Sequence, residues 1–68
     1  MKSEAVKLGE NLRLIRTGNC MSQGDIVRAL GMGRGFVSNI ENGKGNPTLT
    51  TITKLAKVLG VSTDELLK

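Results

Sequence analysis

The stretch GMGRGFVSNIENG, residues 31–43, decides how this chain folds. Its middle has helical spacing, because Val37 and Ile40 lie three residues apart and an Asn-Gly stop follows. Yet three glycines fall within its first five residues. A glycine inside a helix costs about 0.5–1 kcal/mol relative to alanine. A helix that begins so poorly for stability indicates that its first turn serves another purpose.

The segments before this stretch also predict helices. A first apolar series at helical spacing stops at Gly18, which suits the left-handed position after a helix. Its members are Ala5, Leu8, Leu12 and Ile15. Ser22 then opens a second helix, with Asp25 completing a capping-box pattern, and Gly31 ends it.

The segments after it complete an all-α chain. The third helix runs from about 33 to 42, and the loop GKGNP leads to Thr48, which caps a fourth helix ending at Gly60. The apolar face of this fourth helix consists of Leu49, Ile52, Leu55, Ala56 and Leu59. Ser62 and Glu65 form a capping box that opens a short fifth helix. We therefore expect one domain, residues 1–68, folded as a compact five-helix bundle.

Composition permits an anionic partner. Ten Lys and Arg against six Asp and Glu give a net charge of +4 and a pI near 9.7. Such a mild basic excess suits nucleic acid without requiring it. With one Phe and no Trp or Tyr, the core must be aliphatic.

The residue inventory argues against catalysis, metal and membrane. Cys20 is the one cysteine and there is no histidine, so neither an internal disulfide nor a zinc cluster can form within one chain. We expect Cys20 to be a half-buried thiol between two helices. Asp64 and Glu65 are interpreted as cap residues, and GMGRG lacks the spacing of a phosphate loop. We expect no enzyme activity, no cofactor, no membrane partner and a reducing cytoplasm as the setting.

The short link between the second and third helices predicts a helix-turn-helix. Only Gly31, Met32 and Gly33 join them, and such a connection sets two helices at about 90–120°. Gly31 falls eight residues after Gln23, where this motif needs positive φ.

At these residues the chain resembles the DNA-binding domain of the Cro and phage-repressor family, which also occurs in restriction–modification controller proteins. The resemblance extends from about Leu8 to Leu67 and includes SQGDIVRALG, IENGK and LGVSTDELL. It implies a lambda-repressor-like fold whose third helix enters the major groove of DNA.

One face of the third helix is polar and small. At about 100° per residue, Val37 and Ile40 face the core while the opposite side carries the polar residues. The predicted base-contacting residues are Arg34, Gly35, Ser38 and Asn39. Arg34 has the fork that guanine requires, although a phosphate contact or a solvated charge would explain it too. Gly33 and Gly35 would allow the backbone to approach DNA closely, or would merely tolerate a tight turn.

Further residues are predicted to anchor phosphates and to hold the third helix. The phosphate-contacting set is Gln23, Gly33, Asn42, Gly43 and Lys44, with backbone N–H groups expected to donate at 42–44. On its own, Lys44 would be a solvated charge. The resemblance implies an ion pair between Arg16 and Glu41, whereas Arg13 and Arg28 are interpreted as solvated residues.

These features predict a sequence-specific transcriptional regulator that binds a two-fold-related double-stranded DNA operator as a homodimer. The half-sites would lie about 34–36 Å apart. The expected dimer interface consists of Val58, Val61, Leu66 and Leu67. RNA polymerase is a possible further partner, blocked or contacted by the bound dimer. The alternative is a protein-interaction module of the same fold, antitoxin-like or a co-regulator, with weak or no DNA binding.

Overall fold

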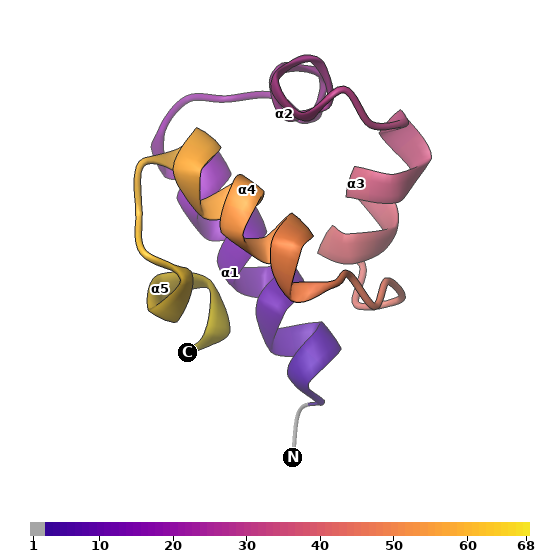
Figure 1. The fold of residues 1–68 in the computed structure, drawn as a ribbon, viewed down its shortest axis with the longest axis vertical. Coiled ribbons are helices and arrows are strands. Elements are labelled where there is room, and N and C mark those ends of the chain that lie inside the picture. Colours follow the sequence, from indigo (N-terminus) through magenta and orange to yellow (C-terminus); the bar gives the residue numbers. More distant parts are fainter. Residues whose placement is uncertain (1–2) are drawn as a thin grey trace.

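The computed structural model describes residues 3–68, which form five α-helices and no strand. The helices are α1 (Glu4–Gly18), α2 (Gln23–Leu30), α3 (Arg34–Glu41), α4 (Leu49–Leu59) and α5 (Thr63–Leu67). Figure 1 shows α1 and α4 near the centre of the view, α2 seen nearly end-on at the top, and α3 and α5 on opposite sides. The expected all-α, five-helix architecture is confirmed.

The boundaries around the helix-turn-helix follow the predicted caps. Ser22 and Asp25 form a reciprocal capping box, in which the Asp25 N–H donates to Ser22 Oγ at 3.1 Å and the Ser22 N–H donates to Asp25 Oδ2 at 2.8 Å. Gly31 ends α2 with φ 69°. The Thr51 N–H donates to Thr48 Oγ1 at 3.3 Å, so Thr48 caps α4.

The end of α1 differs from the prediction. Gly18 is the last helical residue, and the left-handed position falls at Cys20 with φ 58°. The Met21 N–H donates to the Arg16 carbonyl and the Cys20 N–H to the Thr17 carbonyl, both at 3.0 Å, which is the bonding pattern of a Schellman motif. The expectation that Cys20 is half-buried is also wrong, because this turn leaves the residue exposed.

Two details of the last helices also differ. Leu49 was expected on the apolar face of α4, but it is 70% exposed because it lies at the first position of the helix, before the face meets the core. Ser62 precedes α5 but makes no side-chain cap hydrogen bond. Instead of reaching back to Ser62, Glu65 accepts from Lys68 Nζ at 3.0 Å.

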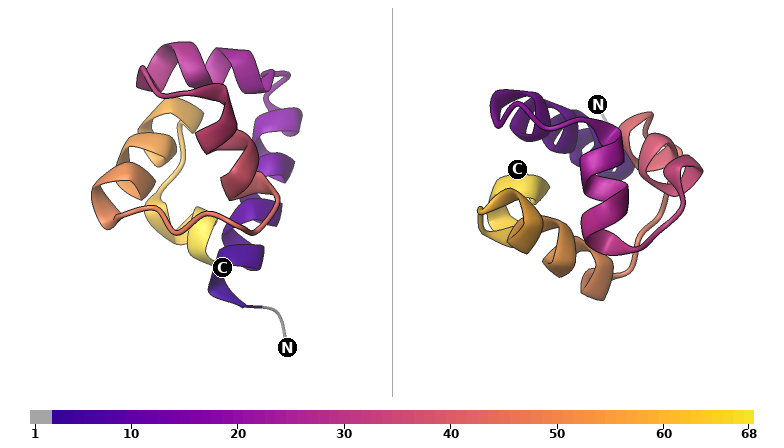
Figure 2. Two further views of the ribbon diagram at one scale, coloured as in Figure 1. Left: turned by 90° about the vertical axis from the view of Figure 1, so that its right-hand side faces the viewer. Right: turned by 90° about the horizontal axis from the view of Figure 1, so that it is seen from above.

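The core is aliphatic, as expected, and draws on all five helices. Its buried members are Leu8, Leu12, Ile26, Val37, Ile40, Ile52, Leu55, Ala56, Leu59 and Leu66. Val37 and Ile40 turn inward from α3, so the opposite face of that helix is directed to solvent. Figure 2, left, looks onto α3 from outside the molecule.

Gly9 allows α1 and α3 to approach each other at backbone distance. It is buried in the middle of α1, and a Cβ atom there would lie 2.3 Å from the Ile40 carbonyl oxygen and 2.8 Å from that of Glu41. Real Cβ atoms do not approach backbone so closely, so any side chain would push α3 away. No local sequence pattern marks Gly9 for this role.

A buried carboxylate fixes the same end of α3. The Glu41 side chain is 0% exposed and the Arg16 side chain 12%. Arg16 Nε donates to Glu41 Oε2 at 2.5 Å and Arg16 Nη2 donates to Oε1 at 2.9 Å. Gln23 Nε2 donates to Oε1 at 3.0 Å, while Arg16 Nη1 donates to the Met21 carbonyl at 2.8 Å. One carboxylate thus joins α1, the start of α2 and the end of α3.

The electrostatics of this group follow from its partners. Burial alone would raise the pKa of Glu41, but hydrogen bonds from Arg16 and Gln23 and the charge of Arg16 outweigh burial and lower the pKa below its usual value. The hydrogen bond to Glu41 raises the pKa of Arg16. Both groups therefore remain charged at neutral pH.

Gly9→Ala should lower the free energy of unfolding by about 1–3 kcal/mol, because the new methyl group overlaps the carbonyl groups of α3. Gly18→Ala is the matched control, since Gly18 lies in the same helix and has nothing within 4 Å of its Cβ position. Urea denaturation should show the control unchanged or stabilised by up to about 1 kcal/mol. Equal effects at both positions would contradict the close helix crossing.

Glu41→Gln should lower the free energy of unfolding at pH 7 by about 3–5 kcal/mol, because it leaves the Arg16 charge buried without a counter-ion. Since the folded-state pKa of Glu41 is depressed, its contribution is present above the unfolded pKa of about 4.3 and is lost as pH falls through the folded value. The difference between wild type and variant should therefore shrink in acid. Glu65→Gln, at an exposed pair, is the control and should change little. A difference that stays constant from neutral to acidic pH would contradict this origin.

Candidate nucleic-acid interface

The outward face of α3 presents the predicted recognition residues to solvent. Arg34, Gly35, Asn39 and Asn42 are exposed, and Ser38 is half-buried. Asn42 Nδ2 lies 3.5 Å from Ser38 Oγ, which places the two side chains on one side of the helix. The face is polar, short and open along its whole length.

The glycines at the start of α3 are not required by the fold. Gly33 is the N-cap with φ −69°, and Gly35 has no positive φ either. A Cβ atom at either position would meet nothing within 4 Å. The left-handed residue of the turn before α3 is Gly31, so neither Gly33 nor Gly35 is needed for a positive φ.

The N-terminus of α3 offers unused hydrogen-bond donors. Gly33 has no side chain with which to cap the helix, and the N–H groups of Arg34 and Gly35 find no acceptor among residues 3–68. Open N–H groups at a helix N-terminus favour an anion such as phosphate. The start of α3 thus combines two residues without side chains, Gly33 and Gly35, with open N–H groups that carry partial positive charge.

Arg34 extends this positive charge towards α2. Its Nη2 atom lies 3.5 Å from the position a Cβ would take at Gly24, and Arg28 Nη1 lies 3.8 Å from the same point. Arg28 also pairs with Asp25. Two guanidinium groups therefore flank the first turn of α2. In this structure the Arg34 guanidinium lies against the first turn of α2 and is exposed to solvent.

Gln23 lies at the first position of α2, as expected, but its side chain faces inward. Its Nε2 atom donates to Glu41, so one amide hydrogen is already used in holding α3. The second hydrogen of this amide is available for a phosphate. Gln23 thus combines a structural contact with its predicted anchoring position.

The far end of α3 differs from the prediction in its donors. The N–H groups of Asn42, Gly43 and Lys44 were expected to face phosphates, but each donates to a carbonyl of α3, at 3.0, 3.1 and 2.9 Å. Gly43, at φ 75°, closes a Schellman motif that uses these groups. Only side chains, those of Asn42 and Lys44, remain for a ligand there.

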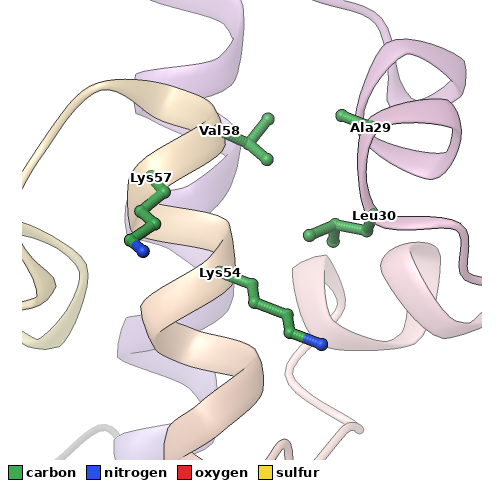
Figure 3. A pocket seen from close by; sticks show the side chains of 5 residues that line it. All are labelled: Ala29, Leu30, Lys54, Lys57 and Val58. Carbon is green, nitrogen blue, oxygen red and sulfur yellow. The ribbon is translucent and has the colours of Figure 1, made fainter.

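The four residues expected at a dimer interface lie in different environments. Leu66 is fully buried in the core of its own chain and has no surface for a second copy, so that expectation is wrong. Leu67 is 47% exposed and Val61 is half-buried. Val58 lines an open groove of about 310 Å³ between α2 and α4. Figure 3 shows Val58 and Leu30 directed into this groove from opposite sides, with two lysine side chains beside them.

No cluster of three or more potential metal-ligating side chains occurs among residues 3–68. Within the same range, no helix is long and apolar enough to span a bilayer.

The sequence of this chain is similar to those of known helix-turn-helix proteins. The helix-turn-helix family pattern matches residues 12–66. The chain is 47% identical over 60 residues to an SPbeta prophage-derived helix-turn-helix-type transcriptional regulator of Bacillus subtilis, covering 88% of this chain and 56% of that protein. It is 37% identical over 60 residues to the control protein C.SmaI of Serratia marcescens, covering 88% and 71% of the two chains.

Solved structures agree with these matches. The restriction-modification controller protein C.AhdI of Aeromonas hydrophila superimposes with a TM-score of 0.88 at 35% identity, over 96% of this chain and 98% of that one. A hypothetical transcription factor from Neisseria superimposes with a TM-score of 0.91 at 35% identity, over 97% and 76%.

The chain spans just over half the length of two of its curated relatives, 56% of the Bacillus subtilis regulator and 57% of a hypothetical transcription factor of Neisseria meningitidis. The proteins named above are transcriptional regulators and controller proteins rather than enzymes. The resemblance to Cro-type and controller proteins is thus confirmed, and the chain belongs to the helix-turn-helix family.

Proposed function

We propose that this chain binds a two-fold-related DNA operator as a homodimer and regulates transcription, with residues 33–42 of each copy in the major groove. A regulator bound in this way blocks RNA polymerase or contacts it, and the position of the operator decides between the two.

The two glycines at the start of α3, Gly33 and Gly35, are the main support for this proposal. Gly35 lies inside α3, where glycine lowers helix stability, and neither Gly33 nor Gly35 has a positive φ or a close neighbour that requires glycine. Close approach to a ligand is a physical reason for such a surface. The N-terminal part of a recognition helix meets base edges in the major groove, where bulk at the tip would hold the backbone away.

The exposed polar residues then take roles according to their chemistry. Arg34 reads guanine, Asn39 reads adenine, and Ser38 contacts either a base or a phosphate. At the two ends of α3, the N–H groups after Gly33 meet one phosphate region, while Asn42 and Lys44 meet another. Gln23 meets a phosphate beside the start of α2 with its second amide hydrogen. Gly43 supports the second region through its turn conformation.

The proposed dimer surface lies on the side of α5. Val61 and Leu67 border it, and Leu14 of the neighbouring α1 is 69% exposed. A two-fold axis over the groove beside Val58 would instead bring the Lys54 and Lys57 side chains of both copies together. Because like charges repel in a self-complementary interface, the α5 side is favoured.

Selection from random duplex DNA, followed by footprinting, tests the proposal as a whole. The selected site should be two-fold related, with half-sites about 34–36 Å apart. Its affinity should fall steeply with salt, by about 0.9 log units per log unit of salt for each phosphate neutralised. Failure to select any sequence, with binding only to a protein partner that is insensitive to salt, would favour an interaction module instead.

Gly35→Leu should separate folding from binding. Leucine is a better helix former and has open space, so the free energy of unfolding should rise by up to about 1 kcal/mol. Affinity for the selected duplex should nevertheless fall at least about tenfold, equivalent to about 1.4 kcal/mol, because the side chain holds α3 away from the groove. Thermal unfolding and a fluorescence titration measure the two effects. Undiminished affinity in the stabilised variant would contradict close approach at this residue.

Leu67→Lys should yield monomers without unfolding the chain, because half of this side chain is already exposed. Sedimentation equilibrium measures the oligomeric state. Ala29→Lys, which places the same charge in the groove between α2 and α4, should leave the dimer intact. The opposite pattern would move the interface to the groove.

A further inference from the structure

At the C-terminal end of α3, only side chains are free to bind an anion. Its backbone N–H groups are all bonded to carbonyls, so a phosphate there can be held only by side chains. Asn42 and Lys44 supply an amide and a flexible ammonium group. The structure brings a third side chain to this point from another element: Arg13 of α1, whose Nη2 donates to Asn42 Oδ1 at 3.2 Å.

Arg13 is not needed to neutralise Glu41. Arg16 already contacts both carboxylate oxygens, at 2.5 and 2.9 Å, and Gln23 gives a third donor. Arg13 Nε lies 3.5 Å from Oε1, at the outer limit of a hydrogen bond. Two guanidinium groups therefore face one carboxylate, leaving one positive charge in excess. Because the Arg13 side chain is 54% exposed and that of Arg16 only 12%, the excess charge is on the accessible arginine.

Arg13 also sets the orientation of the Asn42 amide. Because the guanidinium donates to Oδ1, the amide nitrogen of Asn42 is directed to the other side, where it lies 3.5 Å from Ser38 Oγ. The Asn42 donor is thus presented on the polar face of α3 rather than towards α1. A guanidinium and an amide donor lie side by side at the end of the recognition helix.

We propose that Arg13 is a phosphate anchor of the DNA-binding surface, acting with Asn42 and Lys44 at the C-terminal end of α3. This inference rests on the proposed function. A guanidinium has five N–H donors in a planar fork, of which two are engaged here, and the fork suits a phosphate group. Arg13 would fix a backbone phosphate of the same strand region that Lys44 meets, and so set the depth at which α3 enters the groove.

Arg13→Gln tests the proposal, because glutamine removes the charge but keeps an amide donor for Asn42. The measurement is the slope of log affinity against log salt concentration on the selected duplex. We expect the slope to become shallower by about 0.9 for each bound copy. Lys44→Gln should have the same effect, whereas Lys57→Gln removes an exposed lysine of α4, away from α3, and should leave the slope unchanged.

The results separate this inference from the proposed function. If wild type binds no duplex in a salt-dependent manner, the proposed function itself fails. If wild type binds and Arg13→Gln keeps the wild-type slope, the anchor is wrong even when affinity falls, because Arg13 then acts only through packing. Thermal unfolding of Arg13→Gln should match that of wild type, and Arg13→Lys, which restores the charge, should restore the slope.

Discussion

The position of α3 depends on the hydrogen bonds and ion pair made by the buried carboxylate of Glu41. A single charged group at the end of α3 receives donors from α1 and from the first residue of α2, so both neighbouring helices are fixed relative to it. Removing a carboxylate from water is costly, and the bidentate arginine offsets that cost only in one geometry. Gly9 adds a steric condition, because α1 and α3 meet at backbone distance just beside the same residue. Charge and close packing therefore act on one end of the helix.

This arrangement leaves the outer face of α3 available for function. Val37 and Ile40 complete the core from one side, and the clamp at Glu41 holds the C-terminal end. The first turn, in consequence, tolerates a glycine at position 35. The two ends differ in chemistry. The N-terminal end offers unused backbone N–H groups, whereas the C-terminal end has used its own in a Schellman turn and depends on side chains.

Sequence reasoning located the features that depend on local pattern. Ser22 with Asp25, Gly31 and Thr48 mark helix ends through hydrogen bonds or φ angles set by near neighbours, and these boundaries agree with the structure. The exposed face of α3 followed from helical periodicity in the same way. Position along a helix is harder to predict: the left-handed residue after α1 is Cys20, two residues past the expected Gly18. Within this turn the Asn19 side chain donates to the carbonyl of Leu59 at 3.0 Å. That contact spans two helices and leaves no local signal.

The features that sequence reasoning missed arise where distant elements meet. Gly9 looks like an ordinary glycine inside a helix until α3 is placed against it. Arg13 looks like a solvated charge until the end of α3 supplies Asn42 and Glu41. Leu66 looks as suitable for a dimer surface as Leu67, and only the packing of α5 separates the buried leucine from the exposed one. The roles of these three residues depend on how the helices cross, so residue spacing along the chain does not predict them.

The most direct measurement is an NMR titration of the isotopically labelled protein with its selected duplex. The account predicts that the largest backbone amide shifts fall on residues 33–44 and on the first turn of α2, with smaller changes around Arg13. Shifts concentrated on α4 and α5, with the α3 tip unperturbed at saturating DNA, would contradict entry of this helix into the groove.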